Sequence, residues 1–254
     1  MAQQSYLYGV NAVQTALERH PERVRELWWD ARRQGPRVKA VLEQAQRAGV
    51  PAQPAGRETL DRLSAGARHQ GVVARADAPR PLDEGGLAAL LAGLTDPPFL
   101  LVLDGIQDPH NLGACLRSAD AAGVHAVIAP RDRACSLTPV VRKVASGAAE
   151  SVPLVQVTNL ARSLRELKAR GIWLVGTAGE VSAELFDTDL SGPLALVLGA
   201  EGKGLRRLTR DTCDHLVRLP MRGAVESLNV SVATGVCLYE ALRQRRIEKR
   251  SAPD

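Results

Sequence analysis

Five short apolar runs in the C-terminal part of the chain constrain its fold most strongly. Each run is continuous rather than alternating, and segments with apolar residues at helical spacing lie between them. Strands that are buried on both faces have such sequences, and they belong to parallel sheets covered by helices. The runs are 99–103, 125–129, 172–177, 194–198 and 215–219. The sequence therefore predicts an α/β domain from residue 99 onward.

Helix signals fall between these runs. Thr138 followed by Pro139 marks a helix start, because a hydroxyl can cap a helix and proline suits its first position. Gly171 marks a helix end, and Ser227 can cap the last helix. The helices expected in this part are 111–122, 158–170 and 229–246.

The first 77 residues form a smaller α/β unit of their own. Its expected helices are 11–20 and 37–48, and its expected strands are 24–29, 50–53 and 71–75. Residues 78–98 are rich in Pro and Gly, which is typical of a linker, and contain a short helix over 86–94. The predicted divisions are a small N-terminal unit (1–77), a linker (78–98), a larger α/β domain (99–246) and a flexible basic tail (247–254).

The charge of the chain favours a polyanionic partner. Lys and Arg number 33 against 28 Asp and Glu, which gives a net charge of +5 and an isoelectric point near 9.3. Most of the excess lies in residues 1–77, with 12 basic against 8 acidic residues. Aromatic residues make up only 3%, so an RNA partner, if that is the polyanion, would be contacted mainly at its backbone and folded shape.

The four cysteines predict no metal site. They show neither CxxC pairs nor a His-Cys cluster with zinc spacing, so they are expected to be small buried apolar residues. The chain shows no signal-peptide pattern and no apolar run of the ~20 residues that a membrane span needs. A cytoplasmic protein without metal or membrane attachment is expected.

The first candidate functional segment follows the run 99–103. Asp104 and Asp108 lie in the turn. Their carboxylates can stabilise the turn and cap the next helix, or they can have a functional role. Arg117 lies on the next helix. If that helix faces the strand ends, where ligands gather in open α/β sheets, Arg117 can bind a phosphate with two hydrogen bonds. An exposed surface charge is the alternative.

The second candidate segment is the glycine-rich loop from Gly199 to Gly204. It fits neither the dinucleotide fingerprint nor the phosphate-binding loop of nucleotide hydrolases. The carboxylate of Glu201 would repel a pyrophosphate, whereas it suits a cofactor with a positive sulfonium. Glycines let the backbone approach such a ligand closely. A tight structural turn explains the loop equally well.

The third candidate segment begins the last helix. Asn229, Ser231, Ala233 and Gly235 make this region small and partly polar. A hydroxyl and an amide beside a glycine-rich loop can hydrogen-bond a carboxylate or a ribose. Helix capping and close helix packing are the alternative, and the two roles are compatible.

Together the three segments resemble the motifs of the SpoU (TrmH) family of RNA ribose 2′-O-methyltransferases. Motif one contains Asn111, Gly113 and Arg117, motif two is the loop that starts at Gly199, and motif three is the Ser-Leu-Asn-Val-Ser-Val-Ala segment that starts at Ser227. The segments that begin at Tyr8, His69 and Ser118 extend the likeness to members that modify a guanosine in the peptidyl-transferase region of 23S rRNA.

The resemblance implies properties that composition alone does not. It implies an α/β trefoil knot, although general rules make knots rare, an L30e-like RNA-binding domain at the N-terminus, and a homodimer packed through the last helix. It implies S-adenosyl-L-methionine as cofactor, and 23S rRNA or a large-subunit assembly intermediate as substrate. The implied cofactor-binding residues are Thr177, Gly199, Gly202, Leu219, Ser227, Leu228 and Asn229.

The implied catalytic residues are Arg117, Asn111 and Glu201. The family assigns the base role to the arginine, but a guanidinium keeps its proton in proteins. We therefore expect Arg117 to hold a phosphate and to stabilise the developing alkoxide, with Asn111 positioning it and Glu201 fixing Arg117 or the adjoining loop. His110 is a second candidate base, whereas His125 lies at a strand start and is expected to be structural.

Two other functions compete with this one. A transfer-RNA ribose methyltransferase of the same family would have the same catalytic domain, but the N-terminal unit favours ribosomal RNA. A non-catalytic RNA-binding protein of ribosome assembly would have kept the fold alone, yet all three motifs are intact. The glycine spacing and Glu201 argue against a nucleotide-dependent oxidoreductase.

Overall fold

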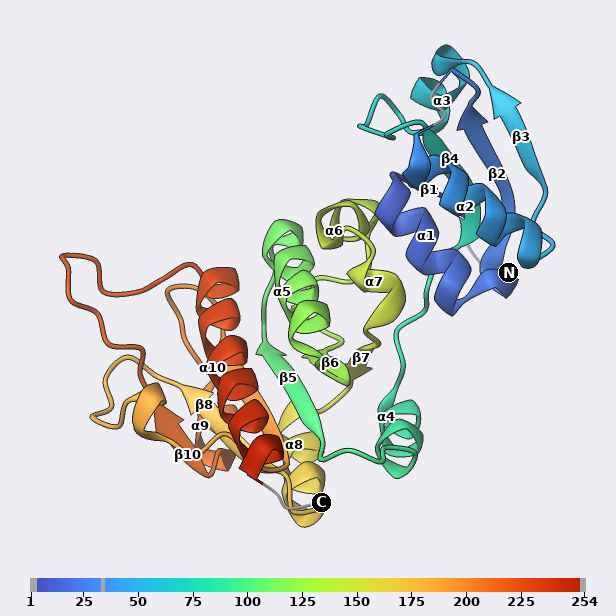
Figure 1. Cartoon of the computed structure of the whole chain (residues 1–254). Helices are drawn as coiled ribbons and strands as arrows, with labels where there is room; N and C mark the ends of the chain where they lie inside the picture. Colours follow the sequence, from blue (N-terminus) through green and yellow to red (C-terminus); the bar gives the residue numbers. More distant parts are fainter. Residues whose placement is uncertain (1–3, 33–34, 252–254) are drawn as a thin grey trace.

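The computed structural model describes residues 4–32 and 35–251, and it contains two sheets (Figure 1). The N-terminal sheet has the order β1-β4-β2-β3, with β1 (Gln4–Tyr8), β2 (Val24–Asp30), β3 (Ala52–Ala55) and β4 (Val72–Asp77). The second sheet has the order β10-β8-β9-β5-β6-β7, with β5 (Phe99–Asp104), β6 (Ala126–Pro130), β7 (Leu154–Val157), β8 (Trp173–Thr177), β9 (Leu194–Gly199) and β10 (His215–Val217).

Helices cover both sheets. In the N-terminal part they are α1 (Val10–Arg19), α2 (Pro36–Arg47) and α3 (Arg57–Leu63), and α4 (Glu84–Ala92) follows. In the second part they are α5 (Pro109–Ala122), α6 (Pro139–Ala145), α7 (Ala148–Ser151), α8 (Leu160–Ala169), α9 (Arg207–Thr212) and α10 (Val230–Ser251). Short 3-10 turns occupy Pro21–Arg23 and Leu185–Asp187.

The second sheet is parallel at every strand pair, as the apolar runs predicted. All five predicted strands form. A sixth strand, β7 (Leu154–Val157), was not predicted. It has only four residues and lies at the edge of the sheet, where a short apolar stretch gives little periodicity to detect.

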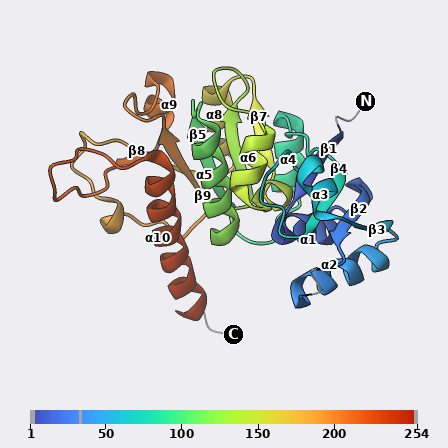
Figure 2. The same cartoon turned by 90° about the horizontal axis from the view of Figure 1, so that it is seen from above.

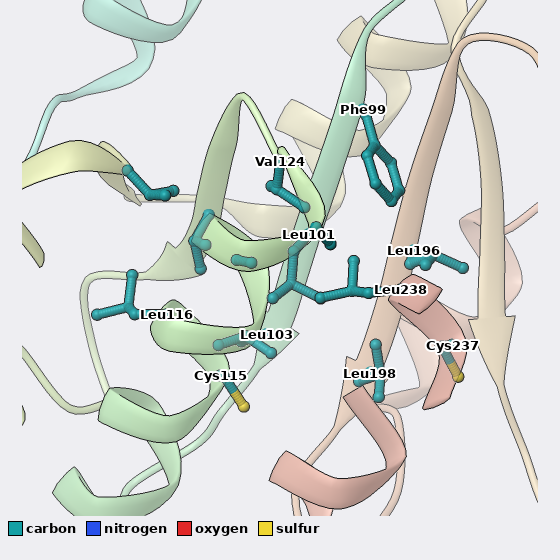
Figure 3. Packing of buried hydrophobic residues seen from close by; sticks show 14 of the residues in the cluster. Phe99, Leu101, Leu103, Cys115, Leu116, Val124, Leu196, Leu198, Cys237 and Leu238 are labelled. Atoms are coloured by element: carbon teal, nitrogen blue, oxygen red, sulfur yellow. The ribbon is translucent and has the colours of Figure 1, made fainter. Parts of the chain in front are cut away.

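Side chains of the two faces of this sheet enter separate cores. Leu101, Leu103 and Leu196 pack against α5 and α10, together with Leu116 and Leu238 (Figure 3). On the opposite face, residues such as Leu100 and Val102 pack against α8 and α4. The alternation along β5 is therefore between two buried layers, which explains why its sequence is uniformly apolar.

The N-terminal sheet packs its core against α1 and α2, with Val13, Leu27 and Val41 fully buried. The predicted helices and strands of this unit form, with ends shifted by one or two residues. Strand β1, which pairs antiparallel with β4, and helix α3 were not predicted. Both are short and interrupted by polar residues, so they form through their contacts rather than through a strong local pattern.

The segment predicted as a linker packs onto the second sheet instead of running free. Leu82 exchanges backbone hydrogen bonds with β7, donating to the carbonyl of Leu154 at 2.8 Å and accepting from Gln156 at 2.8 Å. Asp83 caps α4, and Leu87 is buried against the sheet. Only the stretch before Leu82 connects the two units without such contacts.

Helix α1 packs against α7, and this contact joins the N-terminal unit to the second unit (Figure 1). Gly147 lies at this contact with φ 105°, and a Cβ there would lie 3.1 Å from Thr15 Oγ1 and 3.4 Å from Ala12 Cα. A larger residue would be strained at this φ and crowded by α1.

Helix ends match the sequence in part. Thr138 caps α6 as predicted, whereas α8 begins at Leu160, two residues after the predicted start of 158, with Asn159 as its cap. The prediction that Ser227 caps the last helix is wrong: Asn229 Oδ1 accepts hydrogen bonds from the backbone and hydroxyl of Ser231. Helix α10 continues to Ser251, through much of the predicted flexible tail, whose residues 252–254 lie outside the described residues.

The segment 178–192 forms hydrogen bonds both with the residue that follows β10 and with the C-terminal half of α10. Arg218, which follows β10, donates its backbone N–H to the carbonyl of Ala183 at 2.9 Å. At the other end, Gln244 accepts from the backbone of Leu190, and Arg245 donates to the carbonyl of Ser191. The trefoil knot itself remains a prediction from the family resemblance.

The cysteines behave as small apolar residues. Cys115 and Cys237 are fully buried, and burial raises their thiol pKa values to about 11 and about 12. Burial also raises the pKa of Cys213 to about 12 and that of Cys135 above its usual range. Within the described ranges, no group of three or more His, Cys, Asp or Glu could hold a metal ion. A search of the same ranges finds no helix able to cross a membrane.

Gly113→Ala should destabilise the protein, because α5 and α6 approach closely at this glycine. The added Cβ would lie 2.7 Å from Val144 Cβ and 2.9 Å from the backbone oxygen of Val141. We expect the free energy of unfolding in urea to fall by about 1–3 kcal/mol, despite the higher helix propensity of alanine. The matched control is Gly93→Ala, whose Cβ meets only ordinary contacts at 3.6 Å or more. Equal stability of the two variants would contradict the packing account.

Candidate active site

A pocket of about 230 Å³ lies beside the carboxyl ends of β8 and β10. Thr177 and Ala178 line it from the end of β8, and Leu205 lines it from the segment after β9. The segment between β10 and α10 forms most of the remaining wall. The residues from that segment are Arg218, Leu219, Met221, Glu226, Ser227 and Leu228.

The glycine-rich loop after β9 is a tight turn that forms another part of this wall. The backbone N–H of Gly204 donates to the carbonyl of Ala200 at 2.8 Å, and Gly202 and Gly204 have φ values of 73° and 63°. A Cβ on Gly199 would overlap the carbonyl group of Gly204. The two interpretations of this loop, a structural turn and a part of a ligand site, are therefore compatible, because it is a tight turn whose Lys203 and Gly204 line the pocket.

A buried carboxylate anchors the far end of this loop. Asp104, at the end of β5, is 1% exposed. Its Oδ2 accepts the backbone N–H of Arg206 at 2.9 Å, and its Oδ1 accepts the guanidinium Nε at 2.6 Å. Asp104 therefore ties the glycine-rich loop to the centre of the sheet, and Asp108 caps α5 by accepting from His110 N at 2.9 Å.

Two ion pairs hold the segment after β8 against the pocket. Glu180 pairs with Arg210 of α9, and both residues line the pocket. Glu184 pairs with Arg218 at 3.0 Å, and Arg218 is also a lining residue. The wall thus presents a carboxylate beside a guanidinium, an arrangement that complements the ammonium and carboxylate of an α-amino acid.

The first and third motifs meet through two asparagines. Asn229 Nδ2 donates to Asn111 Oδ1 at 3.0 Å, while Asn229 Oδ1 caps α10. Lower in the same helix pair, Thr234 is fully buried and lies 3.4 Å from Cys115 Sγ. These contacts fix the start of α10 against the start of α5.

Arg117 and the pocket lie on opposite sides of α10 within one chain. Both views place α10 between α5 and the segment 219–229 (Figures 1 and 2). Arg117 follows Gly113 by four residues, so it shares the face of α5 that approaches α6. Its side chain is exposed, and in the described part of the chain it has no hydrogen bond or ion pair.

The predicted site residues therefore divide into groups. Thr177, Leu219, Ser227 and Leu228 line the pocket. Gly199 and Gly202 shape the loop without lining it, and Asn229 acts as a helix cap. Arg117, Asn111 and Glu201 are not among the described lining residues. Glu201 is exposed and makes no contact with Arg117 within the ranges that the structure describes.

Sequence reasoning missed the charged residues of the pocket wall. Glu180 follows Thr177 by three residues, so its place after a predicted strand was an available signal. Arg210 and Arg218 had no such signal, because only their ion pairs across the fold reveal them.

The two histidines near motif one differ in role. His125 Nδ1 accepts the backbone N–H of Phe99 at 3.0 Å at the start of the sheet, which confirms the structural role predicted for it. His110 is exposed in the first turn of α5. It precedes Arg117 by seven residues, so both lie on one side of that helix.

Comparisons with known proteins agree along nearly the whole chain. Residues 98–239 match the SpoU rRNA methylase family, and residues 6–82 match the family described as RNA 2′-O ribose methyltransferase substrate binding. The 23S rRNA (guanosine-2′-O-)-methyltransferase RlmB of Pseudomonas putida is 55% identical over 249 residues, which cover 98% of this chain and 100% of that protein. The protein of that name from Escherichia coli is 56% identical over 239 residues, covering 94% of this chain and 98% of that one.

A solved structure shares the fold. The SpoU methyltransferase AviRb from Streptomyces viridochromogenes, in complex with the cofactor AdoMet, is similar with a TM-score of 0.77 and 27% sequence identity. The similarity covers 96% of this chain and 91% of that chain.

Gly199→Ala should weaken binding of S-adenosylmethionine by about tenfold or more, because the loop cannot close over a Cβ at this position. Isothermal titration calorimetry measures the dissociation constant directly. Gly223→Ala is the matched control, since a Cβ there meets no heavy atom within 4 Å. Unchanged affinity in Gly199→Ala would show that the loop does not form the cofactor site.

Proposed function

The chain belongs to the SpoU rRNA methylase family, and we propose that it transfers a methyl group from S-adenosylmethionine to the ribose 2′-hydroxyl of a guanosine in 23S rRNA. The pocket formed by Thr177, Leu219, Ser227 and Leu228 carries this proposal, because these four residues, which the family resemblance implies for cofactor binding, line it together. The target lies in the peptidyl-transferase region, in 23S rRNA or in a large-subunit assembly intermediate. Such an enzyme works in the cytoplasm.

The pocket fits the cofactor by its chemistry. Leu205, Leu219 and Leu228 supply apolar walls for a flat base. The paired charges of Glu180 and Arg210 match the amino-acid end of S-adenosylmethionine. The volume of about 230 Å³ lies just below the range of 300–1,000 Å³ usual for ligand pockets. We therefore expect the ligand to separate this ion pair, with its ammonium group binding Glu180 and its carboxylate binding Arg210.

The N-terminal unit supports ribosomal over transfer RNA. It has its own sheet and core, and it matches a substrate-binding family along most of its length. We propose that residues 1–77 are an L30e-like RNA-binding domain and that residues 99–246 are a knotted catalytic domain. The transfer-RNA enzymes with the nearest motif pattern generally lack such an N-terminal domain.

The bound cofactor would supply a methyl group on a positive sulfur, and the chain must position and deprotonate the ribose hydroxyl. Arg117 stays protonated, so it serves as a cation that holds the neighbouring phosphate and stabilises the alkoxide. Asn111, held by Asn229 at 3.0 Å, fixes the start of the helix that carries Arg117. His110, on the same side of α5, is the side chain suited to accept the proton. We assign Glu201 to the adjoining loop.

A site that contains both the pocket and an Arg117 side chain requires a second copy of the chain. Within one copy, α10 lies between α5, the helix that carries Arg117, and the segment 219–229, which lines the pocket (Figure 1). We propose a homodimer in which Arg117 of the partner subunit reaches the pocket. Helix α10 offers an apolar stripe for this contact: Val232 and Tyr239, seven residues apart, are 52% and 53% exposed, and Ile247 is 52% exposed. Large exposed apolar side chains in such a row are typical of an interface.

Methyl transfer tests the function directly. With labelled S-adenosylmethionine, we expect label in unmodified 23S rRNA, at a guanosine ribose of the peptidyl-transferase region, and none in unmodified transfer RNA. Label only in transfer RNA would contradict the substrate. Absence of label in naked rRNA and in assembling subunits alike, with cofactor binding intact, would support the non-catalytic RNA-binding alternative.

Mixed dimers test the shared site. Arg117→Ala alone should abolish turnover while keeping its affinity for S-adenosylmethionine. Gly199→Ala alone should bind the cofactor more weakly and lose most of its turnover when the cofactor concentration is well below its raised dissociation constant. Refolding an equal mixture of the two variants should restore about one quarter of wild-type activity, because half of the dimers are mixed and each has one intact site. If each chain carried its own complete site, the mixture would stay inactive. Size-exclusion chromatography with light scattering confirms the dimer in each sample.

A further inference from the structure

A second and larger cavity lies between the two units, away from the cofactor pocket. Its volume is about 560 Å³, which is within the range of ligand-binding pockets. Strand β1, the start of α1 and the segment after α3 form one side, and α6 forms the other. The proposal below rests on the proposed function, since it concerns the RNA substrate.

The cavity is positively charged. Arg68 lines it from the N-terminal unit, and Arg142 and Lys143 line it from α6. Among the described residues that line it, none is acidic. Arg142 is already neutralised by Glu150, with which it forms a buried ion pair at 2.8 Å. Arg68 and Lys143 are exposed and, in the described part of the chain, have no ion pair. Two free cations thus remain for a ligand.

The same cavity contains two of the three tyrosines in a chain that is poor in aromatic residues. Tyr6 and Tyr8 lie two residues apart on β1, so they share one face of the strand, while Leu7 between them enters the core. Tyr6 is 44% exposed, and its ring lies 6.1 Å from that of Trp28. An exposed aromatic surface beside free cations suits an unstacked base and its phosphate.

The cavity lies one helix away from the catalytic face. Helix α6 borders the cavity with Lys143 and packs against α5 at Gly113, the residue one turn before Arg117. Packed helix axes lie about 8–10 Å apart. A nucleotide chain that passes Arg117 can therefore reach the cavity within a few nucleotides, since stacked nucleotides rise about 3.4 Å each.

We propose that this cavity holds one unpaired nucleotide of the RNA, a few positions from the ribose that is methylated. The base lies against Tyr6 and Tyr8, and Arg68 and Lys143 hold the adjoining phosphates. Because each unit supplies one of the two cations, the nucleotide also fixes the N-terminal unit relative to the catalytic domain.

The test uses the full-length protein and a transcript of the peptidyl-transferase region of 23S rRNA. We expect the double variant Arg68→Gln, Lys143→Gln to bind this transcript about tenfold more weakly, with a salt dependence reduced by about two units of slope. Tyr6→Ala should weaken binding by about fivefold or more, through the loss of base stacking. The dissociation constant for S-adenosylmethionine and the unfolding curve should not change in either variant.

The matched control is the double variant Arg47→Gln, Arg165→Gln. It removes one exposed arginine from each unit, and neither residue lines the cavity. An equal loss of RNA affinity in the control would show only a general charge effect and would overturn the proposal, as would full RNA affinity in the cavity variants. Failure of the wild type to methylate any RNA would instead contradict the proposed function, so the two failures are distinguishable.

Discussion

Asp104 and Gly199 are partners at the last position of the β5–β9 pair. The two segments with the predicted site residues, α5 and the glycine-rich loop, follow these two strand ends. From β5 the chain turns toward α5 and Arg117, whereas from β9 it turns into the glycine-rich loop. The strand order reverses direction between these two strands, which is where open α/β sheets bind ligands. The buried carboxylate of Asp104 accepts hydrogen bonds from the backbone and guanidinium of Arg206, which follows the loop. The glycine-rich loop is therefore anchored at the carboxyl end of β5, next to the position where the strand order reverses.

The motif glycines owe their identity to close approach rather than to chemistry. Gly113 lets α6 pack on α5, and Gly199 lets the loop fold back on itself. Gly147, outside every motif, is favoured by its φ of 105° at the point where α1 packs against α7. At Gly113 and Gly199 the backbones approach more closely than a Cβ allows, so each of these two contacts fixes the relative position of elements that carry predicted site residues.

The sequence predicted the parts of the structure that depend on local pattern. Continuous apolar runs identified five of the six parallel strands, while the short edge strand β7 has no comparable signal. The assignment of motifs two and three to one pocket came from the family resemblance, since they follow β9 and β10, which are separated in the sheet by β8. Contacts across the fold could not be predicted: Asp104 and Arg206 are 102 positions apart, and Asn229 caps α10 where Ser227 was expected. A site divided by α10 likewise appears only when the helix is placed in space.

These observations separate the chemistry from the choice of substrate. The proposed cofactor pocket presents leucines, backbone and two ion pairs, none of which distinguishes one ribose from another. In the proposed mechanism Arg117 binds a phosphate, which every nucleotide has. Selection of a single guanosine must therefore come from groups outside the pocket. The cavity beside α6 combines free cations with aromatic rings, and α6 packs on α5, the helix that carries Arg117. Since its walls come from both units, a change at the α1–α7 contact would alter which nucleotide is methylated without touching the catalytic residues.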